Sequence, residues 1–286
     1  MSVIRANLID TVRYLSDDIG QRSYLDIDKL NKTASYIESR LVSSGCNVVR
    51  QTFDFRGGKY LNLIAEIKGE NNTKRPLIIG AHYDTVVGTP GADDNASAVA
   101  VLIEIARLCA CSRPDRDIIF VAFSLEEPPA FMTSRMGSFV YAKSLKERGV
   151  SIEGMVSLEM LGYYSDEKGS QIYPLSIFRL FYPDRGNFVA FVGNLSSRSF
   201  TRRFLNTFRS VSTFPVESLN APVFIPGVDF SDHRSFWRFG YPAFMITDTA
   251  FYRNPNYHAP GDLSSTLDYE RMEKLTIGLY EAIRVI

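Results

Sequence analysis

The segment AHYDTVVGTPGADDNASAV, residues 81–99, places one histidine close to Asp84, Asp93 and Asp94. The chain has only three histidines in 286 residues, and His82 comes directly after the apolar run PLIIGA. Imidazole nitrogen and carboxylate oxygen are ligands that zinc accepts in proteins. The spacing is therefore typical of a metal site, and the simpler alternative is a polar loop that happens to contain a histidine.

Histidines and acidic residues also follow the other apolar segments that are predicted to be buried strands. After DIIFVAFSL come Glu126 and Glu127, after MVSL comes Glu159, and a longer loop after AFMIT leads to His258. Ligand sites in open α/β sheets lie beyond the carboxyl ends of the strands. Buried carboxylates are costly unless a positive charge meets them. HYD or EE alone is a weak signal, but a divalent metal explains all four strand ends together.

The elements that must position these side chains alternate along the chain. Period-2 and short apolar runs predict strands, and apolar positions three or four residues apart predict helices. Strands are expected at 46–55, 60–67, 76–82, 117–124, 155–158, 187–192 and 243–247, and helices at 30–41, 96–108, 137–148 and 268–286. Gly45 is a plausible C-cap and residues 56–59 read as a hairpin turn. This alternation predicts an α/β layered sheet, and the lack of repeats or linkers favours one domain.

Charge and composition argue against several functional classes. The chain has 32 basic and 32 acidic residues, so nucleic acid is not an expected partner. The densest basic segment, 198–209, is predicted to be a solvated helix face. No stretch approaches about 18 continuous apolar residues and no signal peptide is apparent, so we expect a cytoplasmic protein without membrane contact. Three cysteines without paired spacing predict neither a disulfide framework nor a cysteine zinc site, and the oligomeric state stays open.

Six motifs occur in one order along the chain: HYD, PGADDNAS, SLEEPP, SLEMLGYY, SDHRSFW and NYHAPGD. In this order they resemble the co-catalytic di-zinc aminopeptidase family, the leucyl aminopeptidase-like enzymes, whose relatives include glutamate carboxypeptidases and glutaminyl cyclases. The resemblance covers most of the chain, from the first helices to the C-terminal helix. It implies a three-layer α/β/α fold with a mixed, largely parallel central sheet, and one zinc-peptidase catalytic domain over residues 1–286.

The resemblance also implies a site that holds two zinc ions per chain. Asp94 is expected to bridge the ions, with Asp93 as the fallback, and the Asp94–Asn95 peptide is expected to be cis. Glu127 binds one ion and Glu159 the other. The full set of implied metal ligands is His82, Asp94, Glu127, Glu159 and His258.

Further residues are expected to serve chemistry around the metals. Asp84 is implied to orient His82, and Glu126 to act as the general base. Tyr257 either donates a hydrogen bond to the oxyanion or is simply a packed aromatic residue. Asp232 and His233 of the SDH motif are expected to line or buttress the site without binding zinc.

The chain departs from the common family pattern in two places. Glu159 stands where the third carboxylate ligand is often aspartate, and its longer side chain can still reach a metal. The residues after Glu127, PPAFMTSRMGS, replace a short glycine-rich turn and are predicted to form a loop near the pocket. Aromatic residues near the motifs can line an apolar pocket, which suggests a preference for apolar N-terminal residues; they are Tyr163, Tyr164, Phe230, Phe251 and Tyr252.

The implied activity is that of an exopeptidase, an aminopeptidase that releases N-terminal residues from peptides with a free N-terminus by attack of a metal-activated water. A glutaminyl cyclase is one alternative, but it binds a single zinc and does not need His82. A carboxypeptidase is another, and its basic pocket would draw on Arg198, Arg202, Arg234 or Arg253. A non-catalytic binding protein on the same fold is disfavoured, because the chain keeps all five ligands and the Glu126 base.

Overall fold

A single eight-stranded sheet forms the centre of the computed structural model, which describes residues 1–71 and 73–286. The strand order is β1-β2-β4-β3-β5-β8-β6-β7. The central strands β4, β3, β5 and β8 run parallel, while β2 pairs antiparallel with β4 and β6 pairs antiparallel with β8. The strands are β1 Asn47–Phe55, β2 Gly58–Ile67, β3 Leu77–His82, β4 Ile118–Phe123, β5 Gly154–Glu159, β6 Val189–Gly193, β7 Val216–Asn220 and β8 Ala243–Thr247.

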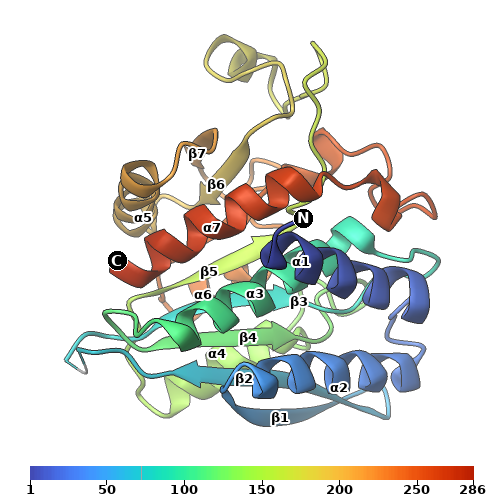
Figure 1. Ribbon diagram of the computed structural model, residues 1–286, viewed down its shortest axis with the longest axis vertical. Helices are drawn as coiled ribbons and strands as arrows, with labels where there is room; N and C mark the ends of the chain where they lie inside the picture. The colour runs from blue at the N-terminus through green and yellow to red at the C-terminus, as the bar shows by residue number, and fades with distance from the viewer. Residues whose placement is uncertain (72) are drawn as a thin grey trace.

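Helices cover both faces of this sheet and make three layers (Figure 1). Helices α1, α2, α3, α5 and α7 lie on the near face in this view, and α4 and α6 lie behind the sheet. The helices are α1 Val3–Arg13, α2 Ile27–Ser43, α3 Ala98–Cys111, α4 Gly137–Glu147, α5 Arg198–Val211, α6 His233–Trp237 and α7 Tyr269–Val285. The predicted three-layer α/β/α fold with a mixed, largely parallel sheet is confirmed.

Local sequence signals set several element boundaries as expected. Helix α2 ends in a Schellman motif, in which Gly45, with φ +90°, donates to Val42 and Cys46 donates to the Leu41 carbonyl. The β1–β2 hairpin turns at Arg56-Gly57, and both residues have positive φ, which a two-residue turn with the correct twist requires. The basic segment 198–209 falls on α5, whose phenylalanines are buried while most of its arginines face solvent.

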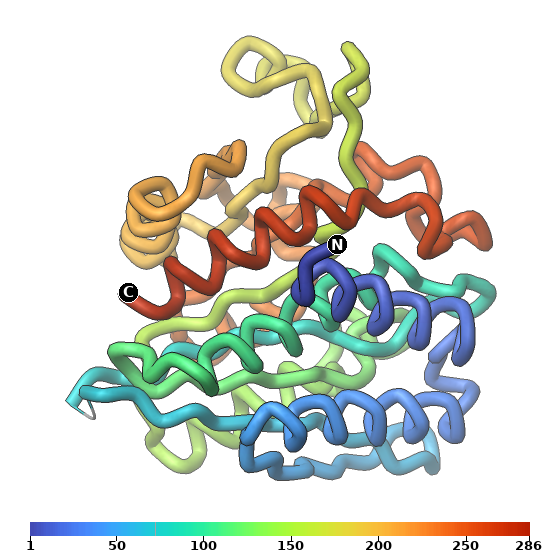
Figure 2. Tube along the Cα trace, viewed as in Figure 1, coloured from blue at the N-terminus to red at the C-terminus, as the bar shows by residue number. Residues whose placement is uncertain are grey.

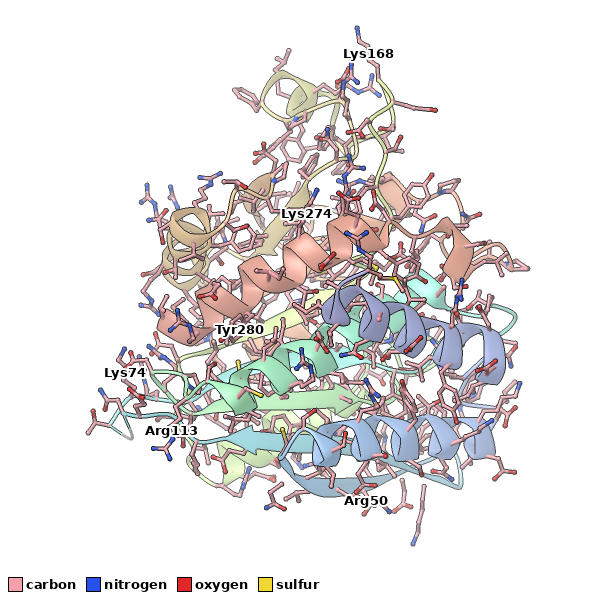
Figure 3. The ribbon with its side chains drawn as sticks, in the orientation of Figure 1. Arg50, Lys74, Arg113, Lys168, Lys274 and Tyr280 are labelled. Carbon is pink, nitrogen blue, oxygen red and sulfur yellow. The ribbon has the colours of Figure 1, made fainter. Side chains whose placement is uncertain are left out.

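The connection between β5 and β6 is long and nearly free of regular structure. It runs from residue 160 to 188 and contains one short 3-10 helix, Ser176–Leu180. Figure 2 shows it in yellow-green to yellow, rising above the rest of the fold, and Lys168 lies at its tip in Figure 3. Connections of this length with little regular structure are uncommon in compact domains, and many of them are functional loops. Within residues 1–71 and 73–286, no helix is both long and apolar enough to cross a membrane.

Candidate metal centre

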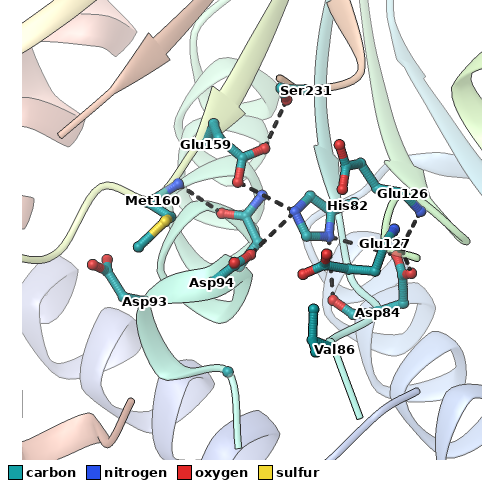
Figure 4. A network of polar contacts seen from close by, with 12 residues as sticks. His82, Asp84, Val86, Asp93, Asp94, Glu126, Glu127, Glu159, Met160 and Ser231 are labelled. Atoms are coloured by element: carbon teal, nitrogen blue, oxygen red, sulfur yellow. Dashed lines mark hydrogen bonds and ion pairs between the residues drawn. The ribbon is translucent and has the colours of Figure 1, made fainter. Parts of the chain in front are cut away.

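The predicted metal ligands come together at the carboxyl ends of the parallel strands. His82 is the last residue of β3, Glu159 is the last residue of β5, and Glu127 follows β4 after a short turn. Because these strands are parallel neighbours, their ends meet at one edge of the sheet. Asp94 arrives from the turn that precedes α3, and His258 from the loop after β8. Figure 4 shows four of these five side chains and their polar contacts.

The five side chains form two clusters that share Asp94. In the first cluster, His82 Nε2 lies 3.4 Å from Asp94 Oδ1 and 3.3 Å from Glu159 Oε1. In the second, His258 Nε2 lies 3.1 Å from Asp94 Oδ2 and 3.4 Å from Glu127 Oε1. Ligand atoms of His82, Asp94 and Glu127 also lie within 4.8 Å of one another, so the clusters are adjacent. Each cluster thus offers one nitrogen and two oxygens, with Asp94 contributing one oxygen to each.

These separations fit the ligand shell of a zinc ion. Two ligands at about 2.05 Å from a tetrahedral zinc lie about 3.3 Å apart, which is close to the separations in both clusters. Asp94 Oδ1 and Glu127 Oε1 are buried, and neither has a hydrogen-bond partner in the part of the chain that the structure describes. A cation between the ligand atoms satisfies these oxygens where a proton on the imidazole does not.

The electrostatics of the clusters point to the same requirement for positive charge. Burial raises the pKa of Glu127 to about 8, with a further contribution from the Asp94 charge. Burial disfavours the charged form of His258, but Asp94 and Glu127 outweigh it and raise its pKa to about 10. The same competition raises the pKa of His82 well above its usual value, with Glu159 as the main opposing charge. Without a metal, protons on the histidines must supply the charge that the carboxylates need.

Asp84 supports both clusters from behind. Its carboxylate accepts hydrogen bonds from the backbone amides of Glu126 and Glu127, over 3.0 and 3.1 Å. His82 Nδ1 lies 3.2 Å from the Asp84 carbonyl oxygen and 3.5 Å from Asp84 Oδ1. Because both neighbours are acceptors, the hydrogen of a neutral His82 resides on Nδ1, and Nε2 is free to face Asp94 and Glu159.

The structure distinguishes the two adjacent aspartates. Asp94 lies between the two histidines. The Asp93 carboxylate turns away from His82 (Figure 4). It accepts hydrogen bonds from Gly162 N and Asn254 Nδ2. The Asp94–Asn95 peptide bond is cis, as expected. Asn95 accepts from Met160 N and donates to the Leu158 carbonyl, which ties the Asp94 turn to the residues on either side of Glu159.

Two further predicted residues, Glu126 and Tyr257, lie beside the clusters. Glu126 is 5% exposed, and its carboxylate makes no hydrogen bond within residues 1–71 and 73–286. Burial raises its pKa well above the usual value, and the neighbouring Glu127, Glu159 and Asp232 add to the shift. The Tyr257 ring stacks on His258 with centroids 3.8 Å apart. Burial and the nearby carboxylates raise the Tyr257 pKa, so its phenol stays protonated and can donate.

The two SDH residues have different surroundings. Asp232 is fully buried near His82, and neither of its carboxylate oxygens has a hydrogen-bond partner among the described residues. Burial raises its pKa to about 7. His233 instead bonds through Nε2 to the Val228 carbonyl and packs edge-on against Trp237. Asp232 therefore borders the centre, and His233 supports the wall behind it.

Sequence reasoning missed two residues that hold the Asp94 turn. Asp262 accepts hydrogen bonds from the backbone amides of Asp93 and Asp94. It lies in the HAPGD motif four residues after His258, so its position was available as a signal. Arg22 is fully buried and donates to five backbone carbonyls, those of Leu15, Gly20, Tyr83, Pro90 and Gly91. No sequence pattern around Arg22 predicts this role.

An apolar cavity of about 110 Å³ opens next to Glu159 and Tyr257. Of the aromatic residues expected there, Phe230, Phe251 and Tyr252 line it, whereas Tyr163 and Tyr164 do not. The β5–β6 connection supplies Tyr173, Pro174, Phe178 and Tyr182, and none of the four arginines considered for a carboxypeptidase pocket lines the cavity. The residues after Glu127 form the predicted turn-rich loop, and its Phe131 ring packs edge-on against Phe230.

Comparisons with known proteins extend this picture. The Bacillus subtilis zinc aminopeptidase BSAP superposes with a TM-score of 0.75 at 18% identity, over 98% of this chain and 95% of that structure. A glutaminyl cyclase from Bacteroides thetaiotaomicron superposes with a TM-score of 0.74 at 18% identity, over 98% of this chain and 97% of that structure. These likenesses show the shared fold, which carries both an aminopeptidase and a cyclase.

Sequence comparison identifies the family. The Escherichia coli (strain K12) protein YfbL is 45% identical over 277 residues, which cover 94% of this chain and 84% of YfbL. Six other relatives, named as zinc metalloproteases or as an aminopeptidase, are matched over only 23% to 44% of their own length. Residues 62–283 match peptidase family M28. Because this match covers well over half of the chain, the chain belongs to peptidase family M28.

Proposed function

We propose that this chain is a zinc-dependent aminopeptidase that binds two zinc ions and removes N-terminal residues from peptides in the cytoplasm, with residues 1–286 as one catalytic domain. The observation that carries the proposal is the pair of histidine–carboxylate clusters that share Asp94, with Glu126 beside them. Membership in a peptidase family and the fold shared with a zinc aminopeptidase support it.

The clusters define which residues would hold each ion. His82, Asp94 and Glu159 would hold one, and His258, Asp94 and Glu127 the other. Zinc in such a site acts as a Lewis acid that makes water more acidic and polarises a peptide carbonyl. Asp84 keeps both clusters in place through His82 and the backbone of Glu127.

Glu126 is the proton carrier of the proposed reaction, because its buried carboxylate lies beside the clusters (Figure 4). It accepts a proton from the attacking water as the water oxygen bonds to the peptide carbonyl carbon. It then returns that proton to the leaving amine when the C–N bond breaks. Tyr257 lines the cavity, and its phenol donates a hydrogen bond to the carbonyl oxygen as negative charge develops there.

The structure favours this reaction over the two alternatives. A single-zinc cyclase needs Asp94, Glu127 and His258 only, yet His82 and Glu159 form an equally close second cluster. A carboxypeptidase needs a cation to bind the substrate carboxylate. Arg234 is instead paired with Asp229, and Arg253 donates to Gln171 and to the Phe188 carbonyl.

Metal content per chain, measured together with hydrolysis of a leucyl chromogenic amide, tests the proposal. We expect two zinc ions in the wild type and in Glu126→Ala, with activity lost only in the variant. Glu167→Ala is the matched control, because Glu167 is exposed on the β5–β6 connection and its loss should leave activity unchanged. One tightly bound ion together with cyclisation of N-terminal glutamine would instead establish a cyclase.

A further inference from the structure

One row of paired residues links the metal centre to the edge of the sheet. Glu159 on β5 pairs with Thr247 on β8, Thr247 pairs with Ala190 on β6, and Ala190 pairs with Glu217 on β7. Directly paired residues point to the same face of a sheet, so the four side chains project on one side. Since neighbouring strands lie about 4.8 Å apart, the backbones at Glu159 and Glu217 are separated by about 14 Å along this row.

The apolar cavity lies over this row. All four residues of the row line it, and the next row, with Leu219, Val192 and Met245, extends its floor. Rings from the β5–β6 connection and from residues 251–257 form the opposite wall. The cavity is therefore an apolar channel with a carboxylate at each end: the metal-cluster residue Glu159 at one, and Glu217 at the other.

Among the described residues, none forms a direct polar contact that accounts for the position of Glu217. It is half-buried on β7, and its carboxylate makes no hydrogen bond or ion pair anywhere in residues 1–71 and 73–286. The hydroxyls of its neighbours Tyr173 and Tyr182 donate instead to the carbonyls of Pro183 and Ser218. Burial raises the pKa of Glu217, while the charge of Arg209, which donates to the Val216 carbonyl, acts in the opposite direction.

We propose that Glu217 selects peptides whose first residue has a long side chain with a cationic end, lysine or arginine, in place of the apolar first residue that the aromatic lining alone suggests. The inference rests on the proposed function, because it places the substrate α-amine near Glu159 and the first side chain in the channel. In an extended lysine the two amines lie about 7.5 Å apart. With a hydrogen bond of about 2.8 Å at each end, a bound lysine spans about 13 Å from one carboxylate to the other. This distance is close to the separation of about 14 Å between the two ends of the row. The aliphatic stem contacts the apolar walls, and the ammonium pairs with Glu217.

Lysine and norleucine substrates test this inference, because norleucine has the same four-carbon side chain without the amine. We expect kcat/KM of the wild type to be at least about tenfold higher for the lysyl amide than for the norleucyl amide. In Glu217→Gln the lysyl value should fall about tenfold or more, and the norleucyl value should change less than about twofold. Glu167→Gln, which removes an exposed charge from the nearby connection, should leave the ratio unchanged.

The outcomes separate this inference from the proposed function. Two results would overturn the role of Glu217 and leave the aminopeptidase intact. One is hydrolysis of the norleucyl amide with a kcat/KM equal to that of the lysyl amide. The other is an equal loss of kcat/KM for both substrates in Glu217→Gln. If no aminoacyl amide is hydrolysed, the proposed function fails, and calorimetric binding of free lysine and norleucine decides the inference. Tighter binding of lysine that disappears in Glu217→Gln supports it, and equal binding overturns it.

Discussion

The Asp84 carboxylate accepts a hydrogen bond from the backbone amide of Glu127 over 3.1 Å. This contact joins the end of β3 to the end of β4, and the same residue faces Nδ1 of His82. Asp84 therefore holds one ligand from each cluster without offering a side-chain oxygen to the clusters themselves. We expect Asp84→Asn to lower metal affinity about 10- to 100-fold, because an amide presents a donor to one of the two backbone amides.

Metal titration against a competing chelator measures this effect. Asp10→Asn is the control, since Asp10 is an exposed aspartate on α1. Far-UV circular dichroism at saturating zinc should show that Asp84→Asn keeps the fold. An unchanged affinity in Asp84→Asn would falsify the supporting role assigned to this residue.

Arg22 should be essential for stability although it touches no predicted ligand. Its guanidinium donates to five backbone carbonyls, most of them buried, and these bonds bring the N-terminal segment against the loops after β3. Arg22→Met leaves these acceptors unpaired, and we expect it to lower the free energy of unfolding by about 3 to 5 kcal/mol. Urea denaturation measures the change, and exposed Arg113→Met should differ from the wild type by less than about 0.5 kcal/mol. Equal stability of the two variants would contradict this account.

His233 should make the fold sensitive to acid. Burial lowers its pKa from 6.5 to about 4, so the folded protein binds this proton less readily than the unfolded chain. A lowered histidine pKa stabilises the fold above the unfolded value and loses that contribution as pH falls from 6.5 toward 4. The loss attributable to His233 between about pH 7 and pH 5 is about 2 kcal/mol.

His233→Gln isolates this contribution, because glutamine retains a donor for the Val228 carbonyl and does not titrate. Chemical denaturation of both proteins at several pH values gives the difference in stability. As the solution is acidified, the wild type should lose more stability than His233→Gln does. Parallel pH profiles for the two proteins would show that His233 does not carry the acid sensitivity.

Metal removal should destabilise the fold through the buried clusters. An ion that binds only the folded state at about 1,000 times its dissociation constant adds about 4 kcal/mol. We therefore expect a chelator to lower the melting temperature of the wild type by several degrees. Asp94→Asn removes the carboxylate that both clusters share, so its melting temperature should respond much less. The same chelator shift in both proteins would place the stabilising ion elsewhere.

The parts of the fold that were predictable are those with strong local signals. Buried apolar runs gave β3, β4, β5 and β8, and periodic stripes gave α2 and α7. Strand β7 was missed because its sequence, VESLN, is half-buried throughout and shows neither an apolar run nor a clean alternation. Helix α1 was missed as well: only Leu8, Thr11 and Val12 of its eleven residues are buried, and its other apolar residues do not mark a single buried stripe.

The candidate site divides in the same way. Residues at strand ends were predictable because the carboxyl ends of neighbouring parallel strands meet at one edge of the sheet, regardless of the conformation of the loops. Arg22 and Glu217 were not, because each depends on the register or packing of segments far apart in sequence. The sequence of the β5–β6 connection shows neither helical nor strand periodicity of its apolar residues. Its contribution to the cavity lining is therefore evident only in the three-dimensional structure.

The position of β7 at the edge of the sheet has a consequence for how substrate selectivity can be changed. Glu217 lies three strands away from the Glu159 carboxylate, on a strand that pairs on one side only. Because β7 has a single neighbouring strand, we expect an exchange at Glu217 to alter what the channel accepts while the two clusters and the inner strands keep their packing. Under the role proposed for Glu217, the choice of the first residue can therefore be changed separately from the chemistry of the two clusters.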